Sequence, residues 1–418
     1  MPTLTASPLA AVYEARQRLQ RVALHTPLQP QLRLSEQYGA NIMLKREDLQ
    51  PVRSYKIRGA FHAIASLSEG AQAQGVVCAS AGNHAQGVAY ACQQLGIEGH
   101  IFMPVTTPHQ KIDQVRHFGK GQVTLWLRGD TFDDCFVEAQ AYAQTHGAQF
   151  IHPFDDPKII EGQATVALEI LEDAQSPIDY LFVPIGGGGL AAGAIRVFSA
   201  LSPQTRIIGV EPEGAASMQA ALAAGEVVTL PEIDKFVDGA AVKRVGVHTL
   251  AACQEGLHAL TTVPEGQICC TILALYNRDA LVVEPAGALS IAALEQWREA
   301  LVGKNVVCVV SGSNNDILRT EEIRERAMRY QGLKHYFLVR FPQRSGALKE
   351  FVNDILEEGD DITFFQYIKK NNREYGPVVV GLEVPSPEAL PRLNARMQVR
   401  NFQYEYINNH EALLQLLV

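Results

Sequence analysis

Residues 180–195 of this 418-residue chain have the sequence YLFVPIGGGGLAAGAI, an apolar run followed by glycines and then by helix-forming residues. The run at residues 180–185 is short and rich in Val, Ile, Leu and Phe, which is typical of a fully buried strand. Gly186, Gly187, Gly188 and Gly189 separate this strand from the predicted helix. A buried strand that leads through a short loop into a helix is the unit of α/β folds with parallel sheets.

The same alternation of strands and helices extends from about residue 20 to residue 325. Four further buried strands are predicted, at residues 75–79, 99–104, 207–211 and 305–311. Amphipathic helices are predicted between strands, for example at residues 86–95 and 163–171. In such folds, ligands bind at the carboxyl ends of the strands. The loops at residues 80–84, 186–190 and 311–314 each follow a predicted strand, so we expect them to lie at this functional edge.

A different pattern follows the charged helix predicted at residues 321–329. Strands are predicted at residues 336–341, 361–369, 377–384 and 402–407, and helices at residues 346–357 and 387–397. The order is βαββαβ, which is that of a ferredoxin-like α+β unit. The sequence therefore predicts a second, smaller domain, with a boundary near residues 325–333.

The composition argues against several classes of protein. The formal net charge is −9 and the isoelectric point is near 5.8, whereas nucleic-acid binders usually present a basic face. No apolar run approaches the roughly 18 residues of a membrane span, and no signal peptide is evident. The seven cysteines include no CxxC pair, which argues against a disulfide framework or a zinc ribbon. We therefore expect a cytoplasmic protein that binds neither nucleic acid nor membranes.

The four glycines indicate an anion site. Bare backbone N–H groups at the start of a helix converge on a bound anion, and the helix dipole favours negative charge there. A phosphate group would suit such a site. A dinucleotide is an alternative, because Glu211 ends the next predicted strand at about the distance expected in dinucleotide-binding folds. A tight strand–helix turn without a ligand is a further alternative.

Lys56 lies in the pentad SYKIR at residues 54–58, among the apolar or aromatic side chains of Tyr55, Ile57 and Phe61. These neighbours are expected to desolvate the amine and favour its neutral, nucleophilic form. A neutral lysine amine can bind an aldehyde covalently. A lysine close to arginines is more often a solvated helix end, and only the companion loops favour the catalytic interpretation.

Two polar residues complete the pattern. Asn83 follows a strand, and its amide can donate to a phenolate oxygen that a carboxylate would repel. Asn83 could also be the N-cap of a helix that starts near Ala85, and the two roles are compatible. Ser311 also follows a strand, and its hydroxyl can face a heteroaromatic ring nitrogen or cap the next helix, whereas His84 is interpreted as a structural loop residue. With Lys56 and the glycine loop, these residues suggest a covalently held carbonyl cofactor that carries a phosphate.

Several segments resemble a known family. KREDLQP at residues 45–51, SYKIRGA at residues 54–60 and SAGNHAQG at residues 80–87 are similar to motifs of the threonine dehydratases, also called threonine deaminases. The glycine loop, with residues 284–288 and 311–314, extends the resemblance to about residue 320. The C-terminal unit is similar to the ACT-like regulatory domain of the biosynthetic form, present once instead of twice.

The resemblance implies the fold, the cofactor and the domain limits. The α/β catalytic domain would have the two-lobed tryptophan-synthase-β fold, which is fold type II of the pyridoxal-phosphate enzymes, and would hold pyridoxal 5′-phosphate. It would occupy residues 1–325, with a small lobe at about residues 50–150. The ferredoxin-like, ACT-like α+β domain would follow at residues 332–418.

The resemblance also implies a role for each site residue. Lys56 would bind the cofactor covalently and take the Cα proton of the substrate, Asn83 would contact the cofactor's 3′-oxygen, and Ser311 would face its pyridine nitrogen. The cofactor phosphate would bind the backbone N–H groups of Gly186, Gly187, Gly188, Gly189 and Leu190. The substrate carboxylate would bind the loop formed by Ser80, Ala81, Gly82 and Asn83.

The implied activity is the dehydration and deamination of L-threonine to 2-oxobutanoate and ammonia, and of L-serine to pyruvate and ammonia. This threonine ammonia-lyase reaction is the first step of isoleucine biosynthesis, and feedback inhibition by isoleucine, opposed by valine, is expected. A homotetramer or a dimer is expected as well. The sequence leaves open which substrate is preferred and whether regulation is retained with a single ACT-like domain.

Two differences from related serine racemases bear on the reaction and on metal binding. Those enzymes carry Ser where this chain has Ala81, so a second acid on the opposite face is missing and elimination is favoured over racemisation. They also carry Asp where this chain has Ser217, beside the position of Glu211 in a divalent-cation site, so we expect no strong divalent metal site. The alternatives are a β-replacement synthase of the same fold and, in a different class, an NAD-dependent dehydrogenase built on the glycine loop and Glu211.

Overall fold

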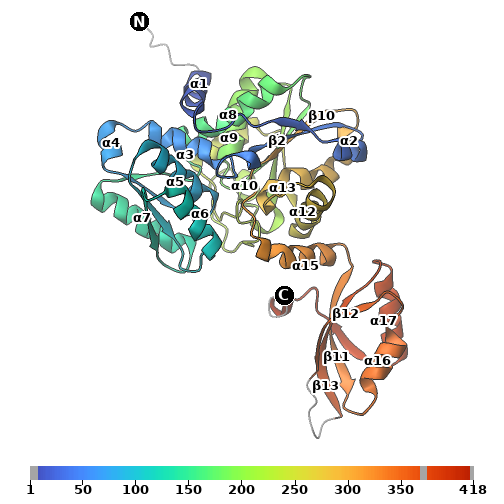
Figure 1. The fold of residues 1–418 in the computed structure, drawn as a ribbon. Helices are drawn as coiled ribbons and strands as arrows, with labels where there is room; N and C mark the ends of the chain where they lie inside the picture. Colours follow the sequence, from blue (N-terminus) through green and yellow to red (C-terminus); the bar gives the residue numbers. More distant parts are fainter. Residues whose placement is uncertain (1–7, 368–373, 415–418) are drawn as a thin grey trace. The chain divides into compact units, whose positions relative to one another are not determined.

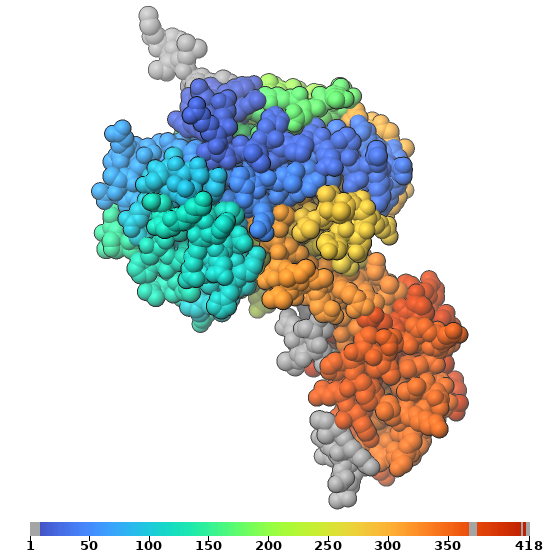
Figure 2. Space-filling model, viewed as in Figure 1, coloured from blue at the N-terminus to red at the C-terminus, as the bar shows by residue number. Residues whose placement is uncertain are grey.

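A computed structural model describes residues 8–367 and 374–414 of the chain. The chain forms two compact units, residues 1–316 and residues 317–418, and each is described by itself (Figures 1 and 2). The domain limits given above stay predictions. Among the described residues, no helix is both long enough and apolar enough to cross a membrane.

The larger sheet of the first unit has six strands. Their order across the sheet is β1 (Leu28–Pro30), β2 (Asn41–Arg46), β10 (Asn305–Val310), β7 (Tyr180–Pro184), β8 (Arg206–Pro212) and β9 (Ala259–Val263). All neighbouring pairs are parallel except β1 with β2, so a short antiparallel strand lies at one edge of an otherwise parallel sheet. The buried strands predicted at residues 180–185, 207–211 and 305–311 are confirmed as β7, β8 and β10.

A second sheet of four parallel strands lies in the same unit. Its order is β5 (Val123–Leu127), β4 (Gly99–Met103), β3 (Val76–Ala79) and β6 (Gln149–Phe150). The strands predicted at residues 75–79 and 99–104 are confirmed as β3 and β4. Every residue of these two strands is buried, as expected for central strands covered on both faces.

Helices surround both sheets (Figure 1). Within the described residues their bounds are α1 Pro8–Leu19, α2 Leu32–Tyr38, α3 Lys56–Ala65, α4 Glu69–Ala73, α5 Asn83–Leu95, α6 His109–Gly119, α7 Phe132–His146, α8 Pro157–Asp173, α9 Gly189–Leu201, α10 Ser217–Ala224, α11 Val247–Gly256, α12 Glu265–Asp279, α13 Pro285–Ala292 and α14 Arg298–Leu301. Helices α3 and α5 pack on each other, as do α8 and α9. Glycine permits the close approach of α8 and α9, because a Cβ at Gly193 would lie 2.7 Å from the backbone nitrogen of Ala164.

A buried ionic cluster anchors the start of α3. The Arg58 guanidinium, which is 1% exposed, donates to both oxygens of Glu47 and both oxygens of Glu169 at 2.6–2.8 Å. Lys45, fully buried on β2, donates to Glu169 at 2.7 Å and to the carbonyl oxygen of Thr26 at 2.5 Å. The cluster ties α3 to β2 and α8, so it holds the helix on which Lys56 is the first residue.

The second unit begins with α15 (Thr320–Tyr330) and has the βαββαβ order predicted from the sequence. The elements are β11 Lys334–Pro342, α16 Ala347–Ile355, β12 Asp361–Tyr367, β13 Tyr375–Glu383, α17 Ala389–Val399 and β14 Gln403–Tyr406, followed by α18 Glu411–Leu414. The sheet is antiparallel, in the order β12-β13-β11-β14, and Phe337, Phe341, Phe351 and Leu393 contribute to its core. The predicted strand at residues 361–369 reaches residue 367, and the last two positions lie outside the described residues.

Candidate functional site

The segment before α3 pairs with the loop after β10. Ser54 and Gly312 form an antiparallel bridge, and the backbone N–H of Tyr55 donates to the carbonyl oxygen of Ser311 at 3.2 Å. The backbone N–H of Ser313 donates to the carbonyl oxygen of Arg53 at 2.9 Å. These bonds bring the two loops together although about 255 residues separate them in sequence. Ser311, 3% exposed, therefore lies beside the residue that precedes Lys56.

The loop after β3 meets these two loops through Asn83. The expectation that the three predicted loops lie at one sheet edge is wrong, because β3 belongs to the four-stranded sheet and β7 and β10 to the six-stranded sheet. The Asn83 Oδ1 atom accepts from Asn314 Nδ2 at 2.7 Å, and Asn83 Nδ2 donates to Glu284 Oε1 at 2.6 Å. Helix α5 begins at Asn83 itself, its N-cap is Gly82, and no side-chain cap bond is present at this helix end in the described structure. The alternative in which Asn83 caps a helix that starts near Ala85 is wrong, because both ends of its amide are bound across the site.

The remaining residues of this loop are partly exposed. The backbone N–H of Gly82 donates to Ser80 Oγ at 3.2 Å, and the backbone N–H of Ser80 donates to Phe102 on β4. Ser80, Ala81 and Gly82 are therefore held at the carboxyl end of β3 by contacts within the loop and to the adjacent strand. Their assignment to the substrate carboxylate stays a prediction.

Lys56 points toward the segment that follows β6. Its Nζ donates to the carbonyl oxygen of Pro153 at 3.0 Å and lies 5.4 Å from the centre of the Tyr55 ring. Burial lowers the pKa of Lys56 to about 8, although the charge of Glu284 opposes this shift. A larger fraction of the amine is therefore neutral near pH 7 than in an ordinary lysine. This is not the environment of a solvated lysine at a helix end.

The glycine loop packs against the same segment. An added Cβ at Gly187 would lie 2.2 Å from the Phe154 ring, and one at Gly186 would lie 2.8 Å from Ala240. Gly188 has a φ of +91°, which side chains rarely adopt, and it is the N-cap of α9. Only glycine fits this loop, which brings bare backbone N–H groups to the start of a buried helix. That is the geometry of an anion site.

Residues 153–156 connect these parts. The Pro153 carbonyl accepts from Lys56, the Phe154 ring supports the glycine loop, and the Asp155 carboxylate accepts from the first N–H groups of α11 at 2.9–3.3 Å. The Asp156 carboxylate caps α8 at 2.7 and 3.2 Å. None of these four was predicted as a site residue, because a carbonyl group or a supporting ring leaves no mark in the sequence pattern.

Two buried groups near the site have shifted pKa values, which leave His84 neutral and Glu284 partly protonated near pH 7. Burial, with a contribution from the charge of Lys56, lowers the pKa of His84 to about 3, so the ring is neutral. Its Nε2–H donates to the Ile151 carbonyl at 3.0 Å, because a carbonyl oxygen can only accept. Burial raises the pKa of Glu284 to about 7, and the charge of Asp238 adds to the shift, whereas the Asn83 amide, Lys111 and the Asn314 N–H oppose it. Glu284 was not predicted as a site residue.

Glu211 is not placed to bind a dinucleotide. Its side chain is fully buried, and its two oxygens accept from the backbone N–H groups of Met218 and Gln219 at 2.7 and 2.8 Å. A carboxylate that recognises a ribose must be open to the hydroxyls. The structure therefore does not favour the dehydrogenase alternative.

The residues that these loops bring together fit a phosphorylated aldehyde cofactor. Lys56 supplies an amine of lowered pKa, and the start of α9 supplies an anion site. Asn83 retains a second amide N–H after its bond to Glu284. Within the described residues, the buried Oδ1 of Asn314 and Oγ of Ser54 have no hydrogen-bond partner. Such orphaned groups next to Lys56 and Asn83 are typical of a site arranged for a ligand.

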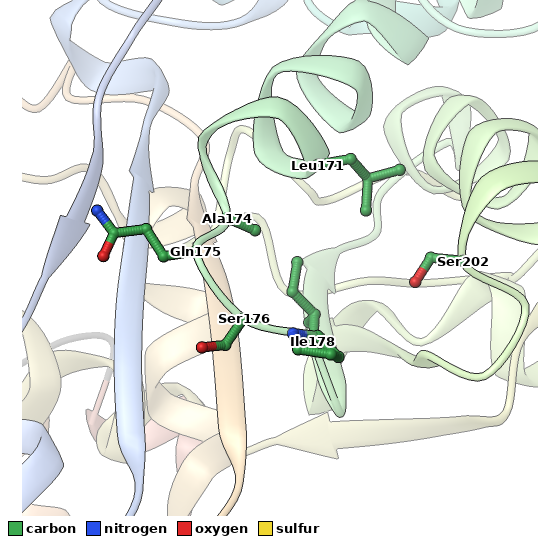
Figure 3. Close-up of a pocket in the computed structure, with 7 residues that line it drawn as sticks. Leu171, Ala174, Gln175, Ser176, Ile178 and Ser202 are labelled. Atoms are coloured by element: carbon green, nitrogen blue, oxygen red, sulfur yellow. The ribbon is translucent and has the colours of Figure 1, made fainter.

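The surface hollow drawn in Figure 3 is a different feature. It has a volume of about 290 Å³ and is lined by Leu171, Ala174, Gln175, Ser176, Pro177, Ile178 and Ser202. Pro177 and Ile178 precede β7, whereas the glycine loop follows it. The hollow therefore lies at the amino ends of the strands, opposite the edge that carries Lys56.

Comparisons with known proteins agree with this arrangement. Residues 19–312 match the family model of the pyridoxal-phosphate dependent enzymes, and residues 325–417 match that of the C-terminal regulatory domain of threonine dehydratase. The biosynthetic L-threonine dehydratase of Halalkalibacterium halodurans is 55% identical over 404 residues, 97% of each chain. That of Bacillus subtilis is 52% identical over 407 residues, 97% of this chain and 96% of the relative. The processed threonine deaminase isoform 2 of Solanum lycopersicum is 40% identical with a TM-score of 0.73, over 77% of this chain and 94% of that structure.

Proposed function

The chain belongs to the pyridoxal-phosphate dependent enzymes and, within them, to the biosynthetic threonine dehydratases, and on this basis we propose how its residues convert L-threonine to 2-oxobutanoate and ammonia. The observation that carries the proposal is the meeting of Lys56, Asn83 and the loop of Ser311, although β3 and β10, the strands before Asn83 and Ser311, belong to different sheets. Pyridoxal 5′-phosphate, when bound, supplies a π-system that withdraws electrons from the substrate Cα.

The proposal gives each residue a binding role. The N–H groups of Gly186, Gly187, Gly188, Gly189 and Leu190 would hold the phosphate at the start of α9. Asn83 would donate its second amide N–H to the 3′-oxygen. Ser311 would place a neutral hydroxyl at the pyridine nitrogen, and a neutral partner leaves the ring a weaker electron sink than an Asp partner does. A neutral hydroxyl at the pyridine nitrogen therefore favours elimination over a long-lived carbanion.

Lys56 would act as the general base. Its amine is kept largely free of bulk water and accepts the Cα proton from one face of the substrate. The loop of Ser80, Ala81, Gly82 and Asn83 would bind the substrate carboxylate and orient the Cα–H bond toward Nζ. The β-hydroxyl takes up a proton and leaves as water, and one water then hydrolyses the released enamine to 2-oxobutanoate and ammonia. Ala81 offers no acid on the opposite face, so no proton returns there.

Turnover of L-threonine is the direct test of this proposal. The full chain with pyridoxal 5′-phosphate is expected to release 2-oxobutanoate and ammonia in equal amounts, and pyruvate and ammonia from L-serine. Oxo acid is measured as its hydrazone, and D-serine by chiral chromatography. Formation of D-serine at a rate comparable to that of pyruvate would contradict the role given to Ala81. Absence of oxo acid from both substrates would contradict the function.

The second unit is proposed to bind isoleucine and valine. The loop at residues 342–348 leads into α16, where Gly346 is the N-cap with a φ of +90°. An added Cβ at Gly346 would meet no atom within 4 Å, so the backbone there is open to a small ligand. A homotetramer or dimer and a cytoplasmic location are part of the same proposal, and sedimentation of the purified chain tests the first.

Isoleucine is expected to raise the threonine concentration for half-maximal rate by about 5- to 150-fold, the usual range of allosteric coupling, and valine to oppose it. Gly346→Ala is expected to weaken this response without changing kcat in the absence of isoleucine, because its φ of +90° disfavours a side chain. Gly359→Ala, at a glycine of φ +93° in another loop of the unit, is the matched control. Saturation curves that isoleucine leaves unchanged would contradict the assignment.

A further inference from the structure

Glu284 lies buried where three loops of the site meet. It precedes α13, is 3% exposed, and its backbone N–H donates to the Gly312 carbonyl at 3.2 Å. Its Oε1 accepts from Asn83 Nδ2 at 2.6 Å, and its Oε2 accepts from the backbone N–H of Asn314 at 3.2 Å. Both oxygens therefore act as acceptors, each toward a different loop.

Glycines leave the Glu284 carboxylate little room to move. An added Cβ at Gly312 would lie 2.5 Å from Glu284 Oε1, and one at Gly239 would lie 3.3 Å from the same atom. An added Cβ at Gly287 would lie 2.2 Å from the Gly312 carbonyl oxygen, so this glycine lets the start of α13 approach the loop. The position of the carboxylate is thus set by backbone on several sides.

The contacts of Asn83 allow one orientation of its amide. Oδ1 accepts from Asn314 Nδ2 at 2.7 Å, and one of the two Nδ2 hydrogens is bound to Glu284. Rotation of the amide by 180° would place Oδ1 against the Glu284 carboxylate and Nδ2 against the Asn314 amide nitrogen. Both contacts would then be repulsive. The remaining Nδ2–H is the group left for a ligand oxygen.

We propose that Glu284 is a positioning residue that fixes the orientation of the Asn83 amide, so that Asn83 presents a donor, and not its carbonyl oxygen, to the 3′-oxygen of the cofactor. The inference rests on the proposed function, because that function supplies the oxygen to be bound. It assigns Glu284 no contact with the substrate or with the reacting atoms.

The charge on Glu284 makes the positioning dependent on pH. Burial and the charge of Asp238 raise its pKa to about 7, opposed by Asn83, Lys111 and Asn314. Lys56 and Tyr55 also interact with its charge. The carboxylate form, present above about pH 7, can accept both hydrogen bonds. Protonation below that pH turns one acceptor into a donor that faces an N–H group, so the Asn83 amide loses its restraint.

Equilibrium binding of pyridoxal 5′-phosphate by the full-length protein, between pH 6 and pH 8.5, tests the inference. Glu284→Gln keeps the shape but offers one acceptor instead of two. At pH 8 it is expected to bind pyridoxal 5′-phosphate about 10- to 100-fold more weakly than the unsubstituted chain. The ratio of the two binding constants is expected to shrink toward pH 6, where the native Glu284 is protonated. Glu299→Gln, on the exposed α14, is the matched control.

A second substitution shows whether Glu284 acts through Asn83. In an Asn83→Ala background, Glu284→Gln is expected to change the binding constant by less than about twofold, because coupled residues are not additive. An undiminished effect in that background, or equal binding by Glu284→Gln and the native chain at pH 8, would overturn the inference. If the native chain takes up no pyridoxal 5′-phosphate, the proposed function itself fails, which is a separate outcome.

Glu284→Asp is a second variant, which tests the inference if Glu284→Gln does not fold. It keeps the charge but is one methylene too short to reach both partners, so it is expected to show a loss similar to that of Glu284→Gln. Circular dichroism and thermal unfolding without added cofactor establish folding. Failure of both variants to fold would show that Glu284 serves the fold and not Asn83, which would also overturn the inference.

Discussion

Replacement of Lys56 by alanine is expected to lower kcat for L-threonine by about 10⁴-fold, the upper end of what a general base contributes. Lys56 is proposed both to bind the cofactor and to take the Cα proton. Its Nζ donates to the Pro153 carbonyl from the first residue of α3, so another lysine cannot replace it at this position. The reaction is followed as 2-oxobutanoate release under saturating substrate.

The matched control for this substitution is Lys304→Ala. Lys304 is an exposed lysine of the same unit, and it forms an ion pair with Asp179 at the amino ends of the strands. It is expected to retain the native rate. A Lys56→Ala protein that keeps full activity would refute the assignment, whereas a loss in both variants would indicate damage unrelated to the site.

Replacement of Arg58 by methionine is expected to destabilise the first unit by about 3–5 kcal/mol, because it leaves Glu47 buried without its cation and leaves Glu169 with Lys45 alone. Burial alone would raise the pKa of Glu169, and the charges of Arg58 and Lys45 outweigh it and lower that pKa. The effect therefore comes from an uncompensated charge as well as from lost hydrogen bonds.

Denaturant unfolding followed by tryptophan fluorescence measures this loss, since both tryptophans of the chain, Trp126 and Trp297, lie in the first unit. Arg16→Met is the control, because Arg16 pairs with Glu172 at the surface and such pairs contribute only about 0–1 kcal/mol. A loss below about 1 kcal/mol for Arg58→Met would contradict the anchoring role of the cluster.

The sequence predicts best what depends on local pattern. Apolar runs bounded by glycine identify β3, β4, β7, β8 and β10, and parallel strands end at a common edge. The loops of Gly186 and Ser311 are therefore correctly assigned to one edge, that of the six-stranded sheet. The loop of Asn83 follows a strand of the other sheet, which the alternation of strands and helices does not reveal. The βαββαβ order of the second unit is predicted for the same reason, because each strand and helix there is short and amphipathic.

The rest depends on contacts between distant residues. Glu284 lies in the segment 284–288 that resembles the family, but no local pattern shows that its carboxylate binds Asn83, which lies 201 positions away. The Pro153 carbonyl and the Phe154 ring act through position alone. The charge state of Glu284 is not predicted from the sequence either, because its pKa of about 7 results from burial, to which the charge of Asp238 adds.

Borohydride reduction of the protein with bound pyridoxal 5′-phosphate, followed by peptide mapping, tests the central assignment most directly. Reduction makes the bond between protein and cofactor permanent, so the modified lysine can be identified by mass. The account predicts one modified peptide, with the added mass on Lys56. Modification of another lysine, such as Lys45 or Lys111, or the absence of any modified lysine, would contradict it.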